Sequence, residues 1–270
     1  MLEYDFMRTA FAAGAIVAIV AGAVGYFLVL RNLTFAGHAL SHVGFAGATG
    51  AILIGVSALW GLLAFTLAAG IAMGFLGERI RGRDVAVGVI LSLALGLGIL
   101  FLYLYTTHAT QATALLFGNV LGVSIDTVWD LLALGGVCLL ALGAISRPLL
   151  FATLEPELAA AKGVPLRLVS VLFLAIVAVA VAEAAQVVGV LLVFALMVGP
   201  AAASLQLTTR VHRGVGLAMI LALLETWFGI ALAYYLDVPA SFCIVLLSCL
   251  VYFASLVRPS DAGELSAANH

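Results

Sequence analysis

The sequence predicts an all-α polytopic membrane protein with about eight or nine transmembrane helices. Of its 270 residues, 65% are hydrophobic and only 9% are charged, and the mean hydropathy is +1.28. A soluble domain carries about 25% charged residues, so this chain has too little charge to cover a water-facing surface. Apolar stretches of about 20 residues, enough to cross a hydrocarbon core about 30 Å thick, recur along the whole chain.

Nine apolar stretches are long enough to be spans. The second and third nearly touch around residues 57–60, and the sixth and seventh nearly touch around residues 186–189. The count falls to eight if one of these pairs is a single broken helix. Residues 1–258 then form one transmembrane domain, and the short polar segment 259–270 is a cytoplasmic tail. In chain order, the predicted spans are 9–30, 36–56, 58–77, 85–105, 128–147, 168–187, 188–207, 214–236 and 239–257.

The basic residues predict the orientation of these spans. Ten of the eleven lysines and arginines fall on one side of the membrane, and only Arg8 falls on the other. Cytoplasmic loops carry an excess of Lys and Arg, so the first side is predicted to be cytoplasmic. The N-terminus is then outside and the C-terminus inside. The residues on the cytoplasmic side are Arg31, Arg79, Arg81, Arg83, Arg147, Lys162, Arg167, Arg210, Arg213 and Arg258.

A pair of histidines stands inside the second span. His38 and His42 are four residues apart, so on a helix they lie about 40° apart on one face. With Arg31 at the cytoplasmic end, a rise of about 1.5 Å per residue places His42 roughly 16 Å deep. Intramembrane ionisable residues usually mark a ligand site or a pathway, so the pair predicts a metal site. The alternative is hydrogen bonding between helices without a metal.

Three acidic residues are candidates for a cation pathway. Glu225 is near the middle of the eighth span, Glu183 is near the outer end of the sixth, and Asp237 is on the outer side. The alternative for the two intramembrane acids is a hydrogen bond to a neighbouring helix. The adjacent Gly199 and Pro200 interrupt the seventh span. They predict either a broken helix, whose free carbonyls would line a cavity, or only a kink.

Two kinds of chemistry are excluded by what the sequence lacks. The single lysine, Lys162, is followed and not preceded by glycine, so there is no Walker A loop and the chain is not expected to hydrolyse ATP. The three cysteines lie inside spans without C-x-x-C spacing, which favours packing over disulfides or metal ligation. We therefore expect no enzymatic activity, no permanently bound cofactor and no nucleic-acid partner.

The longest internal cytoplasmic loop, residues 151–167, predicts a short surface helix. Pro156 suits a first helical turn, and Glu157 complements the positive end of the helix. Alanines propagate the helix, and Gly163 and Pro165 end it. A capped helix is more than a connector needs, so this element is a candidate docking site for a partner.

Together these features resemble the metal-ion permease subunit of the ABC-3 family, the membrane component of zinc, manganese and iron ABC importers. The resemblance covers essentially the full length, and its motifs are specific in combination although none would be alone. They are FLVLRNL at 27–33 with GHALSH at 37–42, LFGNVLGVS at 116–124, ELAAAKGVP at 157–165 and QVVGVLLVFALMVGPAAA at 186–203.

The resemblance implies a fold, partners and site residues. The fold would be that of the vitamin-B12 importer, in a homodimeric permease of the bacterial inner membrane. Two cytoplasmic ATP-binding subunits would bind beneath it, and an extracytoplasmic metal-binding protein would deliver the ion. The metal site would involve the family motif G-D-A-L-S-H, matched here at 37–42. The loop helix would be the coupling helix that contacts the ATPase through Glu157, Leu158, Ala160 and Gly163.

One position departs from the family pattern. The family usually has aspartate where this chain has His38. A carboxylate with an imidazole suits manganese, whereas two imidazoles favour zinc, copper or nickel by ligand softness. We therefore expect import of a divalent metal ion, with zinc favoured and manganese or iron as the alternatives.

Two other functional classes are less well supported by the sequence. An ATP-independent channel or secondary transporter predicts inverted repeats and more intramembrane charge than the sequence shows. An intramembrane enzyme needs a complete catalytic constellation, and only the histidine pair is available.

Overall fold

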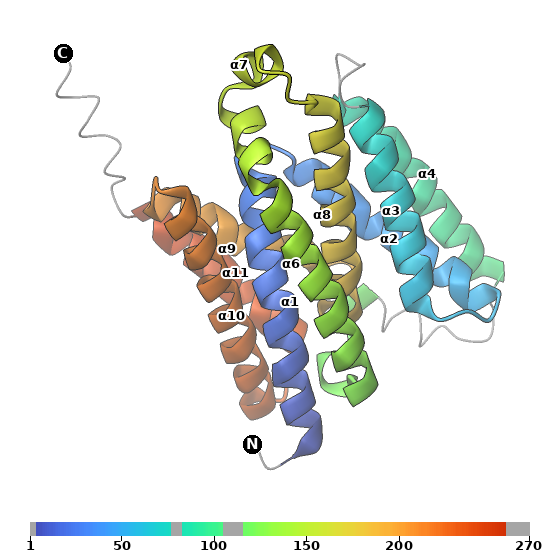
Figure 1. Cartoon of the computed structure of the whole chain (residues 1–270). Coiled ribbons are helices and arrows are strands. Elements are labelled where there is room, and N and C mark those ends of the chain that lie inside the picture. The colour runs from blue at the N-terminus through green and yellow to red at the C-terminus, as the bar shows by residue number, and fades with distance from the viewer. Residues whose placement is uncertain (1–3, 77–82, 105–115, 258–270) are drawn as a thin grey trace.

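The computed structural model describes residues 4–76, 83–104 and 116–257, and these form an all-helical bundle (Figure 1). Nine helices of at least 15 residues occur within this part of the chain, in the predicted order. Seven of them are long and apolar enough to cross a membrane. The long helices are α1 (Asp5–Leu30), α2 (Thr34–Leu53), α3 (Ala58–Leu76), α4 (Arg83–Leu104), α6 (Ile125–Leu154), α8 (Leu166–Val188), α9 (Val193–Leu207), α10 (Val211–Leu236) and α11 (Ala240–Val257).

Two further short helices complete the described elements. The 3-10 helix η1 (Val120–Gly122) precedes α6, and α7 (Pro156–Ala161) lies between α6 and α8. The α7 helix is the surface helix that the loop sequence predicts. The polar tail predicted at 259–270 lies outside the described residues.

Two predicted boundaries differ from the structure by five residues or more. The α6 helix continues to Leu154 and includes Pro148, whereas the predicted span ends at residue 147. The α9 helix begins at Val193 instead of residue 188, because Gly189 adopts a φ of +93° and ends α8.

The predicted interruption of the seventh span at Gly199 and Pro200 is not a break. The α9 helix runs through Pro200, and the Ser248 hydroxyl of α11 donates a hydrogen bond to the Ala195 carbonyl 3.0 Å away. A proline removes one N–H from a helix, and a hydroxyl from a neighbouring helix can satisfy backbone groups beside it. The break lies instead at Gly189, between α8 and α9.

Small residues allow the helices to approach closely. A side chain on Gly25 of α1 would overlap the backbone of Met197 in α9. Gly47 of α2 and Gly61 of α3 face one another in the same way, each against the backbone carbonyl of the other. Such contacts between small residues are the usual basis of helix packing in lipid. Among the seven candidate membrane spans, α1 and α8 are the most deeply buried.

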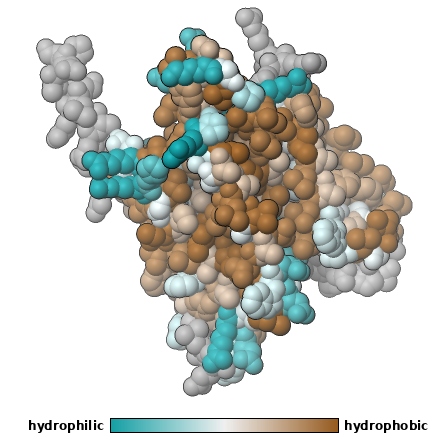
Figure 2. Space-filling model, in the orientation of Figure 1, coloured by the Kyte–Doolittle hydropathy of each residue, from teal (hydrophilic) through white to brown (hydrophobic). Residues whose placement is uncertain are grey.

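The surface has a broad hydrophobic middle with hydrophilic residues toward both ends (Figure 2). Figure 1 shows α7 and the N-terminus at opposite ends of the bundle. The described basic residues at the α7 end include Arg31, which caps α1, Lys162, which caps α7, and Arg210, which precedes α10. Arg8 lies in the second turn of α1, at the other end. Among the described residues, these three basic side chains therefore lie at the end of the bundle opposite to Arg8.

Arg31 joins three helices at the α7 end. Its guanidinium donates to the Thr153 hydroxyl of α6 at 3.2 Å and to the Ser170 hydroxyl of α8 at 3.1 Å. It also lies over the Phe173 ring, 5.5 Å from the centroid. The turn between α1 and α2 is thus connected to the two helices that carry α7.

Candidate functional site

The two histidines of α2 meet at the surface of that helix. Their ring centroids are 4.8 Å apart, with the planes at 83°. Both side chains are only partly buried. The four-residue spacing therefore places two imidazoles side by side, as the sequence predicts, at a position that other molecules can reach.

The surroundings of the pair are mainly apolar. The His38 ring lies edge-on to Phe194 of α9, with centroids 5.3 Å apart. The Ser41 hydroxyl donates to the His38 carbonyl at 2.7 Å, within its own helix. The described residues contain no group of three or more His, Cys, Asp or Glu side chains arranged to hold a metal ion. One chain thus offers two imidazole nitrogen ligands, and the remaining positions around an ion would be filled from outside this set.

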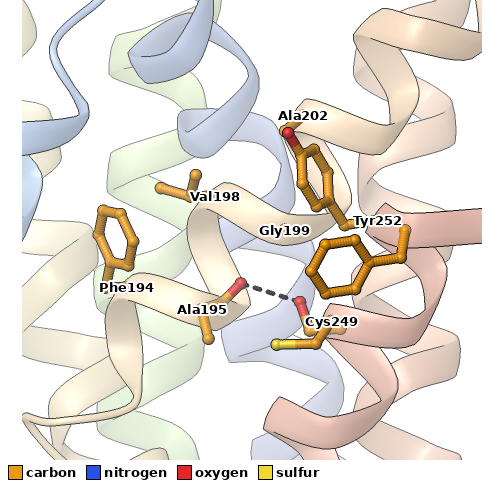
Figure 3. A pocket seen from close by; sticks show the side chains of 9 residues that line it. Phe194, Ala195, Val198, Gly199, Ala202, Cys249 and Tyr252 are labelled. Carbon is orange, nitrogen blue, oxygen red and sulfur yellow. Dashed lines mark hydrogen bonds between the residues drawn. The ribbon is translucent and has the colours of Figure 1, made fainter. Parts of the chain in front are cut away.

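An apolar pocket of about 380 Å³ lies between α9 and α11 (Figure 3). Phe194, which contacts His38, forms one part of its wall, and Ser248 and Tyr252 of α11 form another. Glu225 of α10 lies beside Ser248, is 3% exposed, and has no hydrogen-bond partner for either carboxylate oxygen among the described residues. Glu225 is therefore a neighbour of the lining residue Ser248, as His38 is a neighbour of the lining residue Phe194.

Glu183 has a different setting. It is completely buried in α8, and its carboxylate lies against Gly135 of α6, where an added Cβ would be 2.8 Å from Oε1. The Gly135 position also faces Val20 of α1. Neither carboxylate oxygen of Glu183 has a hydrogen-bond partner among the described residues. Asp237 is exposed and caps α10 with a φ of +55°. The three acids predicted for one pathway are therefore not brought together.

A junction between two of the motif segments was not predicted. Gly118 and Gly189 both have positive φ, and a side chain on either would overlap the backbone of the other segment. The Leu191 N–H donates to the Leu116 carbonyl at 3.2 Å. This contact fixes the turn that starts α9, and so places Phe194 beside His38.

Ser241 of α11 completes this junction. Its hydroxyl lies 2.7 Å from the Phe117 carbonyl and 3.1 Å from the Val188 carbonyl, so it can donate to either. Val188 ends α8, where carbonyls lack partners within the helix. The only sequence signal was the presence of glycine in both segments, and nothing local pointed to Ser241.

The α7 helix presents an exposed face at the end of the bundle. Ala159 is fully buried and anchors the helix, and Lys162 lies over the Phe151 ring of α6 at 5.6 Å. Gly163 has a φ of +79°, and its N–H donates to the Ala160 carbonyl at 3.0 Å. The four residues predicted to couple to a partner are all exposed, namely Glu157, Leu158, Ala160 and Gly163.

The chain matches the ABC 3 transport family over residues 3–259. It is 30% identical to the manganese transport system membrane protein MntC of Halalkalibacterium halodurans, over 98% of this chain and 91% of that protein. It is 29% identical to the manganese import system permease protein ScaB of Streptococcus parasanguinis, over 94% of this chain and 90% of that protein.

Solved structures agree with this assignment. PsaBC from Streptococcus pneumoniae, solved in complex with a Fab, superimposes with a TM-score of 0.86 at 26% identity, over 97% of this chain and 95% of that chain. A metal-chelate type ABC transporter in an inward-facing conformation shares the fold, with a TM-score of 0.69 at 17% identity over 93% of this chain and 85% of that chain. The chain therefore belongs to the ABC 3 transport family, as a membrane-embedded permease of an ABC metal importer, a class of subunit without an ATPase of its own.

Proposed function

We propose that this permease imports zinc and that His38 and His42 are transient ligands of the ion. The observation that carries the proposal is the contact of two imidazoles, 4.8 Å apart, on one partly buried face of a membrane helix. Neutral imidazole is a common zinc ligand, and zinc accepts four ligands in a tetrahedral arrangement. Two protein ligands leave positions open, which allows the ion to enter and leave.

Manganese is the second candidate, because the relatives named above are manganese permeases. Residue 38 distinguishes the two ions. Manganese prefers carboxylate ligands, whereas a pair of imidazoles selects for softer ions. His38 occupies the position where the family pattern has aspartate, so the ligand set of this chain favours zinc.

The proposed ligands from outside the chain are water or groups of a second copy. The permease would act as a homodimer, so that the partly buried histidines of the two copies contribute to one path. Glu225, beside the pocket-lining Ser248, is the acid best placed to lie along this path. Glu183, enclosed by α1, α6 and α8, is a packing residue in this proposal.

The proposed orientation places α7 in the cytoplasm and the N-terminus outside. The basic residues gathered at the α7 end support it by the positive-inside rule. The exposed face of α7 would dock onto an ATP-binding subunit, with two copies per transporter. An extracytoplasmic metal-binding protein would supply the ion at the opposite end.

Reconstitution tests this function directly. The permease, its ATP-binding subunit and its metal-binding protein would be placed in liposomes, and ATP hydrolysis and ion accumulation would be measured together. We expect zinc-loaded binding protein to stimulate ATP hydrolysis and zinc to accumulate only with ATP. Accumulation that is independent of ATP would identify a channel instead.

Thiol labelling tests the orientation. In a background without the three native cysteines, Thr127→Cys, near the start of α6, should react with an impermeant thiol reagent in intact cells. Gly82→Cys, which lies outside the described residues, should react only after permeabilisation. The opposite pattern would reverse the proposed topology without affecting the assignment of the metal ligands.

A further inference from the structure

A groove runs between α6 and α10 at the α7 end of the bundle. Both helices pack on α1, but within the described residues they make few contacts with each other. The space between them encloses about 480 Å³, with Ala23 and Phe27 of α1 among its lining residues. This groove is separate from the pocket lined by Phe194 and Ser248, which lies between α9 and α11.

The groove has an apolar part and a basic part. Leu139 and Leu142 of α6 line it together with Met219 of α10. Arg147 and His212 also line it, and none of the described residues lining it is acidic. Arg147 is exposed and, within the described part of the chain, makes no hydrogen bond, ion pair or ring contact. The groove therefore offers an unpaired guanidinium beside a hydrophobic channel.

The depth of Arg147 matches a lipid headgroup. Arg31 at the end of α1 bonds Thr153, six residues after Arg147 in α6, so Arg147 lies about 9 Å inside the end of α1. The 26 residues of α1 are roughly 39 Å long, whereas the hydrocarbon core is about 30 Å thick. Arg147 thus lies near the boundary between headgroups and acyl chains.

We propose that the groove between α6 and α10 binds an anionic phospholipid, with its phosphate at Arg147 and His212 and an acyl chain along the apolar walls. Arginine binds phosphate through paired N–H donors, and a guanidinium without an acidic partner favours a lipid of net negative charge. Basic pockets between transmembrane helices are a known form of anionic lipid site. The inference rests on membrane embedding and does not depend on which metal is transported.

Lipid retention by the purified full-length chain tests the headgroup contact. Native mass spectrometry would follow binding of phosphatidylglycerol and phosphatidylcholine to the parent, Arg147→Gln and Arg213→Gln. Arg213 is exposed and adjacent in sequence to His212, but it does not line the groove. Arg213→Gln is therefore a control that removes the same charge as Arg147→Gln outside the groove. We expect Arg147→Gln to lower affinity for phosphatidylglycerol by about tenfold, and Arg213→Gln to leave it within about twofold.

A second pair of variants tests the acyl-chain contact. Gly143 lines the groove, and Gly136 lies two turns earlier in α6 outside it; a Cβ added at either meets no atom within 4 Å. Gly143→Leu should weaken phosphatidylglycerol binding, and Gly136→Leu should not. The proposal would be overturned if phosphatidylcholine bound as well as phosphatidylglycerol, or if both arginine variants lost binding equally. It would also be overturned if Gly143→Leu had no effect or if inorganic phosphate competed fully.

Discussion

The histidine pair and the buried carboxylates are both ionisable groups inside the membrane domain, but their surroundings differ. His38 and His42 contact each other and are partly exposed on α2. The Glu183 and Glu225 carboxylate oxygens are buried and have no hydrogen-bond partner among the described residues. A transported ion needs ligands that it can reach and leave. Accessibility, more than charge, therefore separates the candidate metal ligands from the two acids held within the bundle.

The largest expected effect is at the accessible pair. His42→Ala should reduce zinc uptake by more than about tenfold, because one imidazole cannot replace a two-ligand site. The measurement is isotope uptake in cells lacking other importers, normalised to permease in the membrane. Thr49→Ala, on the same helix, is the control, since the Thr49 hydroxyl bonds only carbonyls of its own helix. If His42→Ala and His38→Ala both took up zinc at the parental rate, the pair would have a structural role and would not bind the transported ion.

Variants of α7 should impair transport without changing the proposed metal ligands. Glu157→Lys reverses an exposed charge, and Gly163→Leu forces a β-carbon onto a φ of +79°. We expect each to lower uptake by about fivefold or more through weaker docking of the ATP-binding subunit, with normal membrane insertion. Co-purification of that subunit measures docking. Unchanged co-purification and uptake in both variants would remove α7 from the coupling role.

A smaller effect distinguishes the two carboxylates. Glu225→Gln should lower zinc uptake by about threefold, because Glu225 lies beside Ser248, which lines the same pocket as the His38 neighbour Phe194. Glu183→Gln makes the same chemical change where the carboxylate is enclosed by α1, α6 and α8, and uptake should stay within about 1.5-fold of the parent. A larger loss in Glu183→Gln than in Glu225→Gln would reverse this assignment.

Local patterns predicted most of the fold. Each predicted span corresponds to a helix in the same order, because a membrane-spanning segment can be recognised in the sequence as a continuous apolar run. The α7 helix was predicted from its proline start and glycine end. The boundary between the sixth and seventh spans was predicted at residues 187–188, next to the break at Gly189. The turn that delays the start of α9 to Val193 was not predicted, since the apolar residues continue through it.

Contacts between distant residues explain what the sequence left open. The spacing of His38 and His42 predicted a shared face, but Phe194 reaches His38 only because the glycine junction positions α9. The sequence distinguishes Glu183 from Glu225 only by their positions along their spans, and their neighbours on other helices come from the structure. Such contacts carry no local periodicity, so propensity and hydropathy cannot reveal them.

The ratio of zinc uptake to manganese uptake in the parent and in His38→Asp tests the central claim most directly. If residue 38 binds the transported ion, the parent should favour zinc, and the aspartate should keep transport while moving the ratio toward manganese by about tenfold. Both ions would be measured in the same cells at matched permease levels. An active His38→Asp variant with the same ratio as the parent would contradict metal binding by His38.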